Sequence, residues 1–308
     1  MKLSMVATLY KSRDYIDEFV SRASIAAAKI AGEDYEIILV NDGSPDCSLD
    51  TALKVAETNP HLVIIDLSKN FGHHKAMIAG LTHALGDSIF LIDSDLEEKP
   101  EWLIEFYSIK TDESVDVVYG IQECRKGGFF ERWSGEIYYG LINAFFGLDH
   151  PRNITTARLM TKQYVSAFLA HREREIVISA LWMLTGFKQI GTTVSKSSRD
   201  GKTTYSLAKK FAHLLNVVTS FSARPLIWIF LFGLVTAGVA FLYGFYLIVL
   251  RLFFLISVDG FTSIMVSIWF LGGLNIFFIG VIGLYLSKIF IEAKQRPTFI
   301  VRDVYGRP

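Results

Sequence analysis

Two carboxylates one residue apart make up the strongest chemical motif in the sequence. Asp93 and Asp95 flank Ser94 directly after the apolar run Ile89–Ile92. At the end of a strand, one carboxylate of such a pair can hold a hard divalent cation while the other holds a ribose hydroxyl or a water on the metal. Mg²⁺ or Mn²⁺ bridged to a diphosphate would neutralise the charge that grows on a leaving group. The position of the pair favours a functional site over a solvated acidic turn.

A second polar cluster follows the apolar run Tyr35–Val40. This run stops at Asn41 and Asp42, and Gly43 comes next. Alone, the cluster fits an Asx turn as well as a binding site. Together with the first cluster, it indicates a nucleotide laid across the edge of a sheet. The glycine motifs of dinucleotide oxidoreductases and of P-loop ATPases are missing from the sequence, which argues against both classes.

Alternating strands and helices must position these clusters. The predicted strands are Leu3–Leu9, Tyr35–Val40, Leu62–Asp66, Ser88–Ile92 and Val115–Gly120, and the predicted helices include Asp14–Ala31 and Lys75–Leu85. Such alternation is typical of an α/β fold with a mostly parallel sheet and helices on both faces. Ligands of these open sheets bind at the carboxyl ends of the strands, which is where both polar clusters lie.

The composition indicates a membrane protein with a globular domain. The 308 residues carry 31 Lys and Arg against 31 Asp and Glu, and the mean hydropathy is +0.34. Only 20% of the residues are charged, whereas soluble domains average about 25%. Neither Leu226–Leu250 nor Gly260–Ser287 contains a charged residue, and each exceeds the roughly 20 residues that cross a bilayer. The neutral balance argues against a nucleic-acid partner.

Charges around the two apolar runs predict the topology. The flanking cations are Lys209, Lys210 and Arg224 before the first run and Lys288, Lys294 and Arg296 after the second. The segment between the runs has only Arg251, so the positive-inside rule places both termini in the cytoplasm. Because neither run contains a charge, the pair is expected to be an anchor or a lipid-holding surface rather than a transport path.

These patterns divide the chain into four parts. We expect a cytoplasmic domain over residues 1–205, an amphipathic helix over 206–223, two transmembrane helices within 224–288 and a cytoplasmic tail over 289–308. The amphipathic segment is interpreted as lying in the membrane interface, with an ordinary core helix as the alternative. The N-terminus lacks a signal peptide, and Cys47 and Cys124 have no metal-site spacing, which indicates reduced cytosolic thiols.

Further stretches along the chain complete a family pattern. They are VNDGSPD (40–46), LSKNFGHHKAMIAGL (67–81), LIDSDLEEKPEWL (91–103), DVVYG (116–120), ARLM (157–160), TGFKQ (185–189), TSFSARPL (219–226) and KQRPTFIV (294–301). In these motifs the chain resembles the membrane-anchored family 2 glycosyltransferases, in particular bactoprenol (polyprenyl-phosphate) glucosyltransferases and dolichol-phosphate mannose synthases. The resemblance covers nearly the whole chain and implies a nucleotide-diphospho-sugar transferase (GT-A type) fold.

The resemblance also implies roles for individual residues. It implies nucleotide-sugar binding by Thr8, Tyr10, Val40, Asp42, Asp93, Ser94, Asp95 and Arg199. It implies catalytic roles for Asp93, Asp95 and Arg199, and ligation of Mg²⁺ or Mn²⁺ by Asp95. Glu97 stands where relatives often carry Gln, and it is expected to add either a second metal ligand or only a charge. Arg125, Arg132 and Arg158 are weaker candidates for the acceptor, since the first two could equally be solvated and Arg158 could pair with a carboxylate. His73 and His74 are interpreted as structural or solvated, with contact with a ligand as the alternative.

Several positions depart from the family pattern. Thr8 replaces a usual Pro, Ser12 a Glu, Asn41 an Asp, Thr156 the Asp of G-D-F-R-L, and Thr204 a Lys. The loss of the Asp at position 156 fits a phosphate acceptor, because an ionised phosphate oxygen needs no general base. Catalysis can then rest on positioning and on stabilisation of the leaving diphosphate.

The sequence thus predicts an inverting transfer of a sugar from a nucleotide sugar to a polyprenyl phosphate at the inner face of a bacterial plasma membrane. The favoured donors are UDP-glucose and UDP-N-acetylhexosamine, and a homo-oligomer is a further possibility. One alternative is an enzyme of the same fold acting on a lipid-linked oligosaccharide or a polysaccharide. The other is an idle nucleotide-sugar-binding subunit, in which the departures record lost activity.

Overall fold

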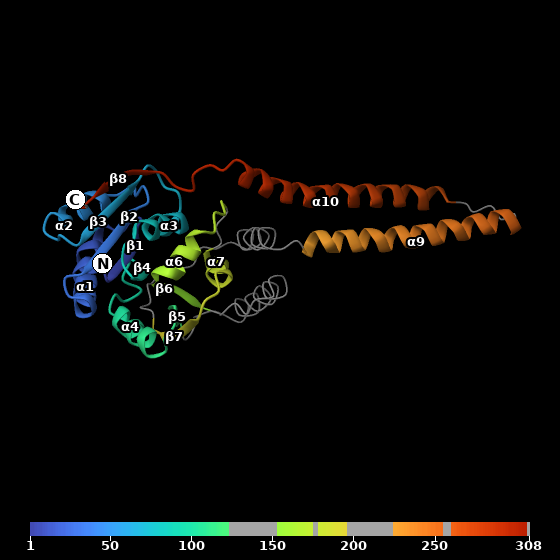
Figure 1. Cartoon of the computed structure of the whole chain (residues 1–308). Helices are drawn as coiled ribbons and strands as arrows, with labels where there is room; N and C mark the ends of the chain where they lie inside the picture. The colour runs from blue at the N-terminus through green and yellow to red at the C-terminus, as the bar shows by residue number, and fades with distance from the viewer. Residues whose placement is uncertain (123–152, 175–177, 196–223, 255–259, 307–308) are drawn as a thin grey trace. The chain divides into compact units, whose positions relative to one another are not determined.

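The computed structural model describes residues 1–122, 153–174, 178–195, 224–254 and 260–306 (Figure 1). Among these residues, 1–122, 153–174, 178–195 and 296–306 belong to one compact unit, which we call the α/β unit. Residues 224–254 and 260–295 belong to a second, helical unit. The predicted amphipathic helix over 206–223 lies outside the described residues.

The α/β unit is built on a sheet with the strand order β7-β5-β6-β4-β1-β2-β3-β8. Its strands are β1 (Leu3–Leu9), β2 (Tyr35–Asn41), β3 (Leu62–Leu67), β4 (Ser88–Asp93), β5 (Val117–Gln122), β6 (Ile154–Thr161), β7 (Gln189–Val194) and β8 (Val301–Tyr305). β1 pairs in parallel with β2 and β4, β2 with β3, and β5 with β7. β6 runs antiparallel between β4 and β5, and β8 runs antiparallel to β3. The predicted α/β fold with a mostly parallel sheet is confirmed.

Helices pack against this sheet on both faces. They are the 3-10 turn η1 (Arg13–Tyr15), α1 (Ile16–Ala31), α2 (Ser48–Ala56), α3 (His73–His83), α4 (Trp102–Asp112), α6 (Lys162–Leu169) and α7 (Ile178–Leu184). α1 contacts α2 and α4, whereas α3 contacts α6 and lies over β1 and β2. Alternate residues of β1 therefore face two layers: Met5 belongs to the core that includes α1, and Val6 faces α3. Gly80 permits the close approach of α3, because a side chain there would collide with Val6 and Val40.

The C-terminal tail adds the edge strand β8, which the sequence did not predict. Asp66, at the end of β3, is 2% exposed at its side chain and forms a 3.0 Å ion pair with the guanidinium of Arg302. The other nitrogen of that guanidinium donates to the carbonyl of Ser68 at 2.7 Å. From the neighbouring strand, Asn41 Nδ2 donates to Asp66 Oδ1 at 2.7 Å. The departure at position 41 is thereby explained, because a carboxylate there would offer Asp66 no donor.

The helical unit contains two long apolar helices, α9 (Arg224–Phe254) and α10 (Phe261–Ala293). Within them, Pro225–Tyr246 and Ser267–Ala293 have mean hydropathies of 2.3 and 2.0 and are long enough to cross a membrane. Their large apolar side chains are mostly exposed, as membrane anchoring requires. Phe232 and Phe278 join the two helices in an edge-to-face contact with ring centroids 5.9 Å apart. α10 continues to Ala293, beyond the end expected near Lys288.

We predict that Arg302→Ala lowers the stability of the α/β unit by about 1 kcal/mol, because it leaves the Asp66 carboxylate without its cation. For a unit of this size, the loss corresponds to a decrease of about 2–4 °C in Tm. The measurement is thermal unfolding of the purified protein in detergent. Arg296→Ala is the matched control, since Arg296 is an exposed arginine of the same tail that precedes β8. An equal decrease in both variants would contradict a specific role of the ion pair.

Candidate functional site

The parallel register of three strands brings the two polar clusters to one edge of the sheet. Thr8 lies opposite Asp93 in the pairing of β1 with β4. On the other side of β1, Leu9 lies opposite Asn41, and its carbonyl accepts a hydrogen bond from the amide of Asp42 at 3.1 Å. The carboxyl ends of β1, β2 and β4 therefore meet at one edge, as the sequence predicted.

A cavity of about 270 Å³ opens at this edge. Its lining consists of Thr8, Tyr10, Asp42, Asn70, Gly72 and His73. The Tyr10 side chain is half-exposed, and the ammonium of Lys11 lies 5.7 Å from the centroid of its ring. A half-exposed aromatic ring beside polar groups is suited to contact a planar base. Three of the residues predicted to bind the nucleotide sugar, Thr8, Tyr10 and Asp42, thus share one cavity.

Asp42 holds the loop that leads into α3. Its two carboxylate oxygens accept hydrogen bonds from the backbone amides of Phe71, at 2.7 Å, and Gly72, at 3.0 Å. Asn70 Nδ2 donates to the Asp42 carbonyl at 3.0 Å. Burial raises the pKa of the Asp42 carboxyl above its usual value, although the two amide hydrogen bonds oppose the shift. Gly43 is required next to it, because its φ is +56° and a side chain would collide with the backbone of Asn70.

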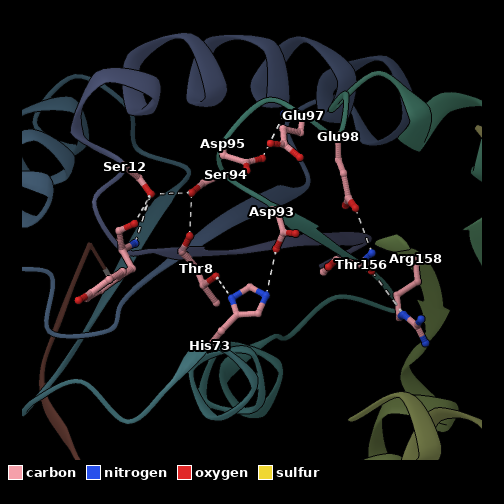
Figure 2. Close-up of polar contacts among 11 residues, drawn as sticks. Thr8, Ser12, His73, Asp93, Ser94, Asp95, Glu97, Glu98, Thr156 and Arg158 are labelled. Carbon is pink, nitrogen blue, oxygen red and sulfur yellow. Dashed lines mark hydrogen bonds and ion pairs between the residues drawn. The ribbon is translucent and has the colours of Figure 1, made fainter. Parts of the chain in front are cut away.

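The D-x-D motif follows β4 in a tight turn (Figure 2). Asp95 Oδ1 accepts a hydrogen bond from the amide of Glu97 at 3.1 Å. Between the carboxylates, the Ser94 hydroxyl is buried, donates to the carbonyl of Thr8 at 2.7 Å and lies 3.2 Å from Ser12 Oγ. Ser94 therefore joins the end of β4 to the end of β1, a different role from the predicted contact with the donor, and that contact stays a prediction.

The carboxylates of Asp95 and Glu97 are the described groups best suited to a metal. Both are half-buried and lie in the same turn. Among the described residues there is no group of three or more His, Cys, Asp or Glu side chains in metal-binding geometry. Mg²⁺ usually binds through one or two carboxylates together with substrate phosphates. The hard oxygen donors of this turn fit such a site.

His73 connects two strand ends and was not among the predicted site residues. Its Nδ1 lies 3.0 Å from Thr8 Oγ1, and its Nε2 lies 3.2 Å from Asp93 Oδ1 (Figure 2). Burial lowers the pKa of His73, but the close contact with the Asp93 carboxylate and the other neighbouring carboxylate charges outweigh burial and raise the pKa above its usual value. The sequence favoured a structural or solvated role for His73 and did not indicate these two contacts of the first residue of α3.

A buried polar cluster lies beside the motif. Glu98 is fully buried, and its Oε1 accepts a hydrogen bond from the amide of Thr156 at 3.0 Å (Figure 2). Arg158 is 1% exposed, and its guanidinium carbon lies 2.9 Å from the centroid of a ring of Trp182. Burial lowers the pKa of Arg158 to about 9, although Tyr164 and Glu98 favour its charged form. Arg158 is therefore still protonated at neutral pH.

The predicted site residues divide into three groups in the structure. Thr8, Tyr10, Asp42, Asp93, Ser94, Asp95 and Glu97 lie at the common edge. Val40 is fully buried beneath α3, one position before the edge, and Arg158 is buried near Glu98. In the described part of the chain, neither side chain is therefore exposed at a surface. Arg125, Arg132 and Arg199 lie outside the described residues, and their roles stay predictions.

Comparison with known proteins extends over the whole chain. A family model described as glycosyl transferase family 2 matches residues 4–169. A putative glycosyltransferase of Mycobacterium tuberculosis is 46% identical over 99% of this chain and 89% of its own length. A prophage bactoprenol glucosyl transferase homologue of Escherichia coli is 32% identical over 99% of both chains. An undecaprenyl-phosphate 4-deoxy-4-formamido-L-arabinose transferase of Enterobacter is 29% identical over 99% of this chain and 94% of its own length.

Solved structures with the same fold are far more distant in sequence. A mannosyltransferase of Pyrobaculum calidifontis, solved with GDP-Man and Mn²⁺, matches with a TM-score of 0.50 and 16% identity. The match covers 70% of this chain and 62% of that one. Glucosyl-3-phosphoglycerate synthase of Mycobacterium tuberculosis matches with the same TM-score and identity over 71% of this chain and 80% of its own. The expected GT-A type fold is confirmed.

We predict that Arg158→Met lowers the stability of the α/β unit by about 3 kcal/mol, because it leaves Glu98 buried without a nearby cation. Adding Glu98→Gln is expected to recover part of this loss, since glutamine still accepts the hydrogen bond from Thr156 but carries no charge. Thermal unfolding of the two single variants and the double variant measures the coupling. Additive losses would show that the two side chains do not interact.

Proposed function

Because the chain belongs to glycosyltransferase family 2 and is therefore a sugar transferase, we propose that it moves one sugar from a nucleotide-activated donor to a polyprenyl phosphate. The observation that carries this proposal is the meeting of Thr8, Asp42 and Asp93 at one sheet edge, next to a cavity that can receive a nucleotide. Two apolar helices in the same chain would hold it at the membrane where such a lipid resides. Relatives named for bactoprenol and undecaprenyl-phosphate transfer match along its full length.

The proposed reaction is a displacement with inversion at the anomeric carbon. An oxygen of the lipid phosphate attacks C1 of the sugar, and the bond from C1 to the diphosphate oxygen breaks. The electron pair of that bond leaves with the nucleoside diphosphate. The attacking phosphate is already ionised, so no proton has to be removed from it. This agrees with a threonine at position 156, whose amide is bound by Glu98.

Each described residue would have a role that follows from its position in the site. Tyr10 and Asp42 would contact the nucleoside in the cavity, and Asp93 would face the sugar-diphosphate at its mouth. Asp95 and Glu97 would hold Mg²⁺ or Mn²⁺, which when bound supplies positive charge to the leaving diphosphate. The main contributions are then proximity and electrostatic stabilisation. UDP-glucose and UDP-N-acetylhexosamine are the donors we favour.

The membrane arrangement is part of the same proposal. The cations that flank α9 and α10 favour a cytoplasmic location for the α/β unit and for both termini. A donor made in the cytoplasm and an acceptor anchored in the inner leaflet would then meet at the membrane surface. The proposed location is the inner membrane of a bacterium.

The test is incorporation of label from a panel of radiolabelled nucleotide sugars into polyprenyl phosphate, with membranes that contain the protein and Mg²⁺. We predict label in the organic phase with one donor, and a decrease of at least about a hundredfold in Asp95→Ala, since loss of leaving-group stabilisation costs this much. Asp17→Ala is the matched control, because Asp17 is an exposed carboxylate on α1.

Each contrary outcome would have a separate meaning. Full turnover in Asp95→Ala would refute the metal-binding role of this carboxylate. Label that enters a lipid-linked oligosaccharide or a polysaccharide, and not the polyprenyl phosphate, would identify the other acceptor class. Protection by nucleotide against thermal unfolding, without transfer from any donor, would favour an idle nucleotide-sugar-binding subunit.

A further inference from the structure

The first turn of α3 is the point at which three strand ends meet. Asp42 at the end of β2 binds the amides of Phe71 and Gly72, which immediately precede the helix. His73, the first residue of α3, then reaches Thr8 on β1 and Asp93 on β4. The imidazole lies between these two side chains and lines the cavity (Figure 2). Its place is thus determined by all three strands that form the site.

The protonation of its two ring nitrogens decides what His73 presents to Asp93. In the imidazolium form, both ring nitrogens donate, and Thr8 Oγ1 accepts from Nδ1. In the neutral form, the Thr8 hydroxyl can donate to Nδ1, which leaves the proton on Nε2. Only the tautomer with a bare Nε2 would place a lone pair against the carboxylate. In the imidazolium and in that neutral tautomer, the protonated Nε2 lies 3.2 Å from Asp93 Oδ1.

Stability alone accounts poorly for this arrangement. The side chain of His73 is 48% exposed, and pairs of exposed ionisable groups contribute about 0–1 kcal/mol to stability. A carboxylate that must meet a ligand in one orientation benefits more, since its rotamer is then fixed before the ligand binds. Asp93 ends a buried strand and begins the D-x-D turn, so its side chain points from a rigid element toward the site.

Thr8 supports the same conclusion. Thr8 is 7% exposed, and its hydroxyl lies within hydrogen-bond distance of His73 Nδ1. Thr8 thus gives the imidazole a second anchor.

We propose that His73 is a positioning residue of the transfer reaction. It holds Asp93 in the orientation in which the carboxylate meets the bound nucleotide sugar, and Thr8 holds His73. This inference rests on the proposed function, because it takes the edge of β1, β2 and β4 as the donor site.

The test compares two amides at position 73. In His73→Gln, the amide nitrogen can occupy the place of Nε2 and still donate to Asp93. In His73→Asn, the shorter amide reaches only the place of Nδ1, near Thr8. We expect His73→Asn to lower kcat/KM for the donor by about tenfold to a hundredfold, and His73→Gln to stay within about threefold of the wild type. His74→Asn is the control, since His74 is the exposed next residue of the same turn.

A second readout does not require transfer. Binding of UDP and GDP with Mg²⁺ is measured by protection of the full-length protein against thermal unfolding. If His73 acts through Asp93, His73→Asn weakens nucleotide binding in the wild type but changes it less than about twofold in an Asp93→Asn background. Thr8→Val is expected to weaken binding in the same direction as His73→Asn, but less.

The outcomes separate the two proposals. Equal losses in His73→Gln and His73→Asn, or an undiminished effect of His73→Asn in the Asp93→Asn background, would overturn the positioning role while leaving the transferase intact. Nucleotide binding with the expected coupling but no transfer to polyprenyl phosphate would support the positioning role and refute the acceptor. A wild type that binds neither nucleotide and transfers no sugar would overturn both.

Discussion

The parallel pairing of β1 with both β2 and β4 is the constraint on which the site depends. Parallel strands all end at the same edge, so the residues that follow them come together although they are distant in the sequence. Here the register places Thr8 beside Asp93 and Leu9 beside Asn41. The loop before α3 then closes the same edge through Asp42. Backbone hydrogen bonds between buried strands therefore fix the positions of the residues around the cavity. Local contacts then orient their side chains.

The central strands were predictable, because each is a short apolar run that the sequence separates with polar turns. The helices α1 and α3 were predicted as well, whereas α2 and α4 were not. The bounds of β1 were predicted as observed, and those of β2 and β4 within one residue. β6, β7 and β8 were not predicted, since β6 and β8 are antiparallel additions and β7 is only partly buried. Their pairing depends on distant partners, which local patterns do not encode.

Part of the candidate site was predictable from residue type and position in the sequence. The rest depends on which atoms a side chain contacts in the fold, and the sequence does not show these contacts. Asp42, Asp93 and Asp95 lie at or just after strand ends, and that position, together with the family resemblance, made them candidates whose roles stay predictions. Ser94 was expected at the donor, yet its hydroxyl binds the carbonyl of Thr8. Arg158 was open between a phosphate and a carboxylate, and the structure shows its side chain buried, with Nε donating to the carbonyl of Thr156. His73 was missed because only the fold shows which strand ends its two nitrogens reach.

The position of β8 has a consequence for the order in which the protein is made. Arg302 pairs with a residue that precedes it by 236 positions, and both apolar helices lie between them. A chain synthesised from its N-terminus exposes the unpaired edge of β3 until the spans have been produced and the tail has emerged. Exposed strand edges invite pairing with other chains. Completion of the sheet therefore waits until the segment that contains both apolar helices has been synthesised.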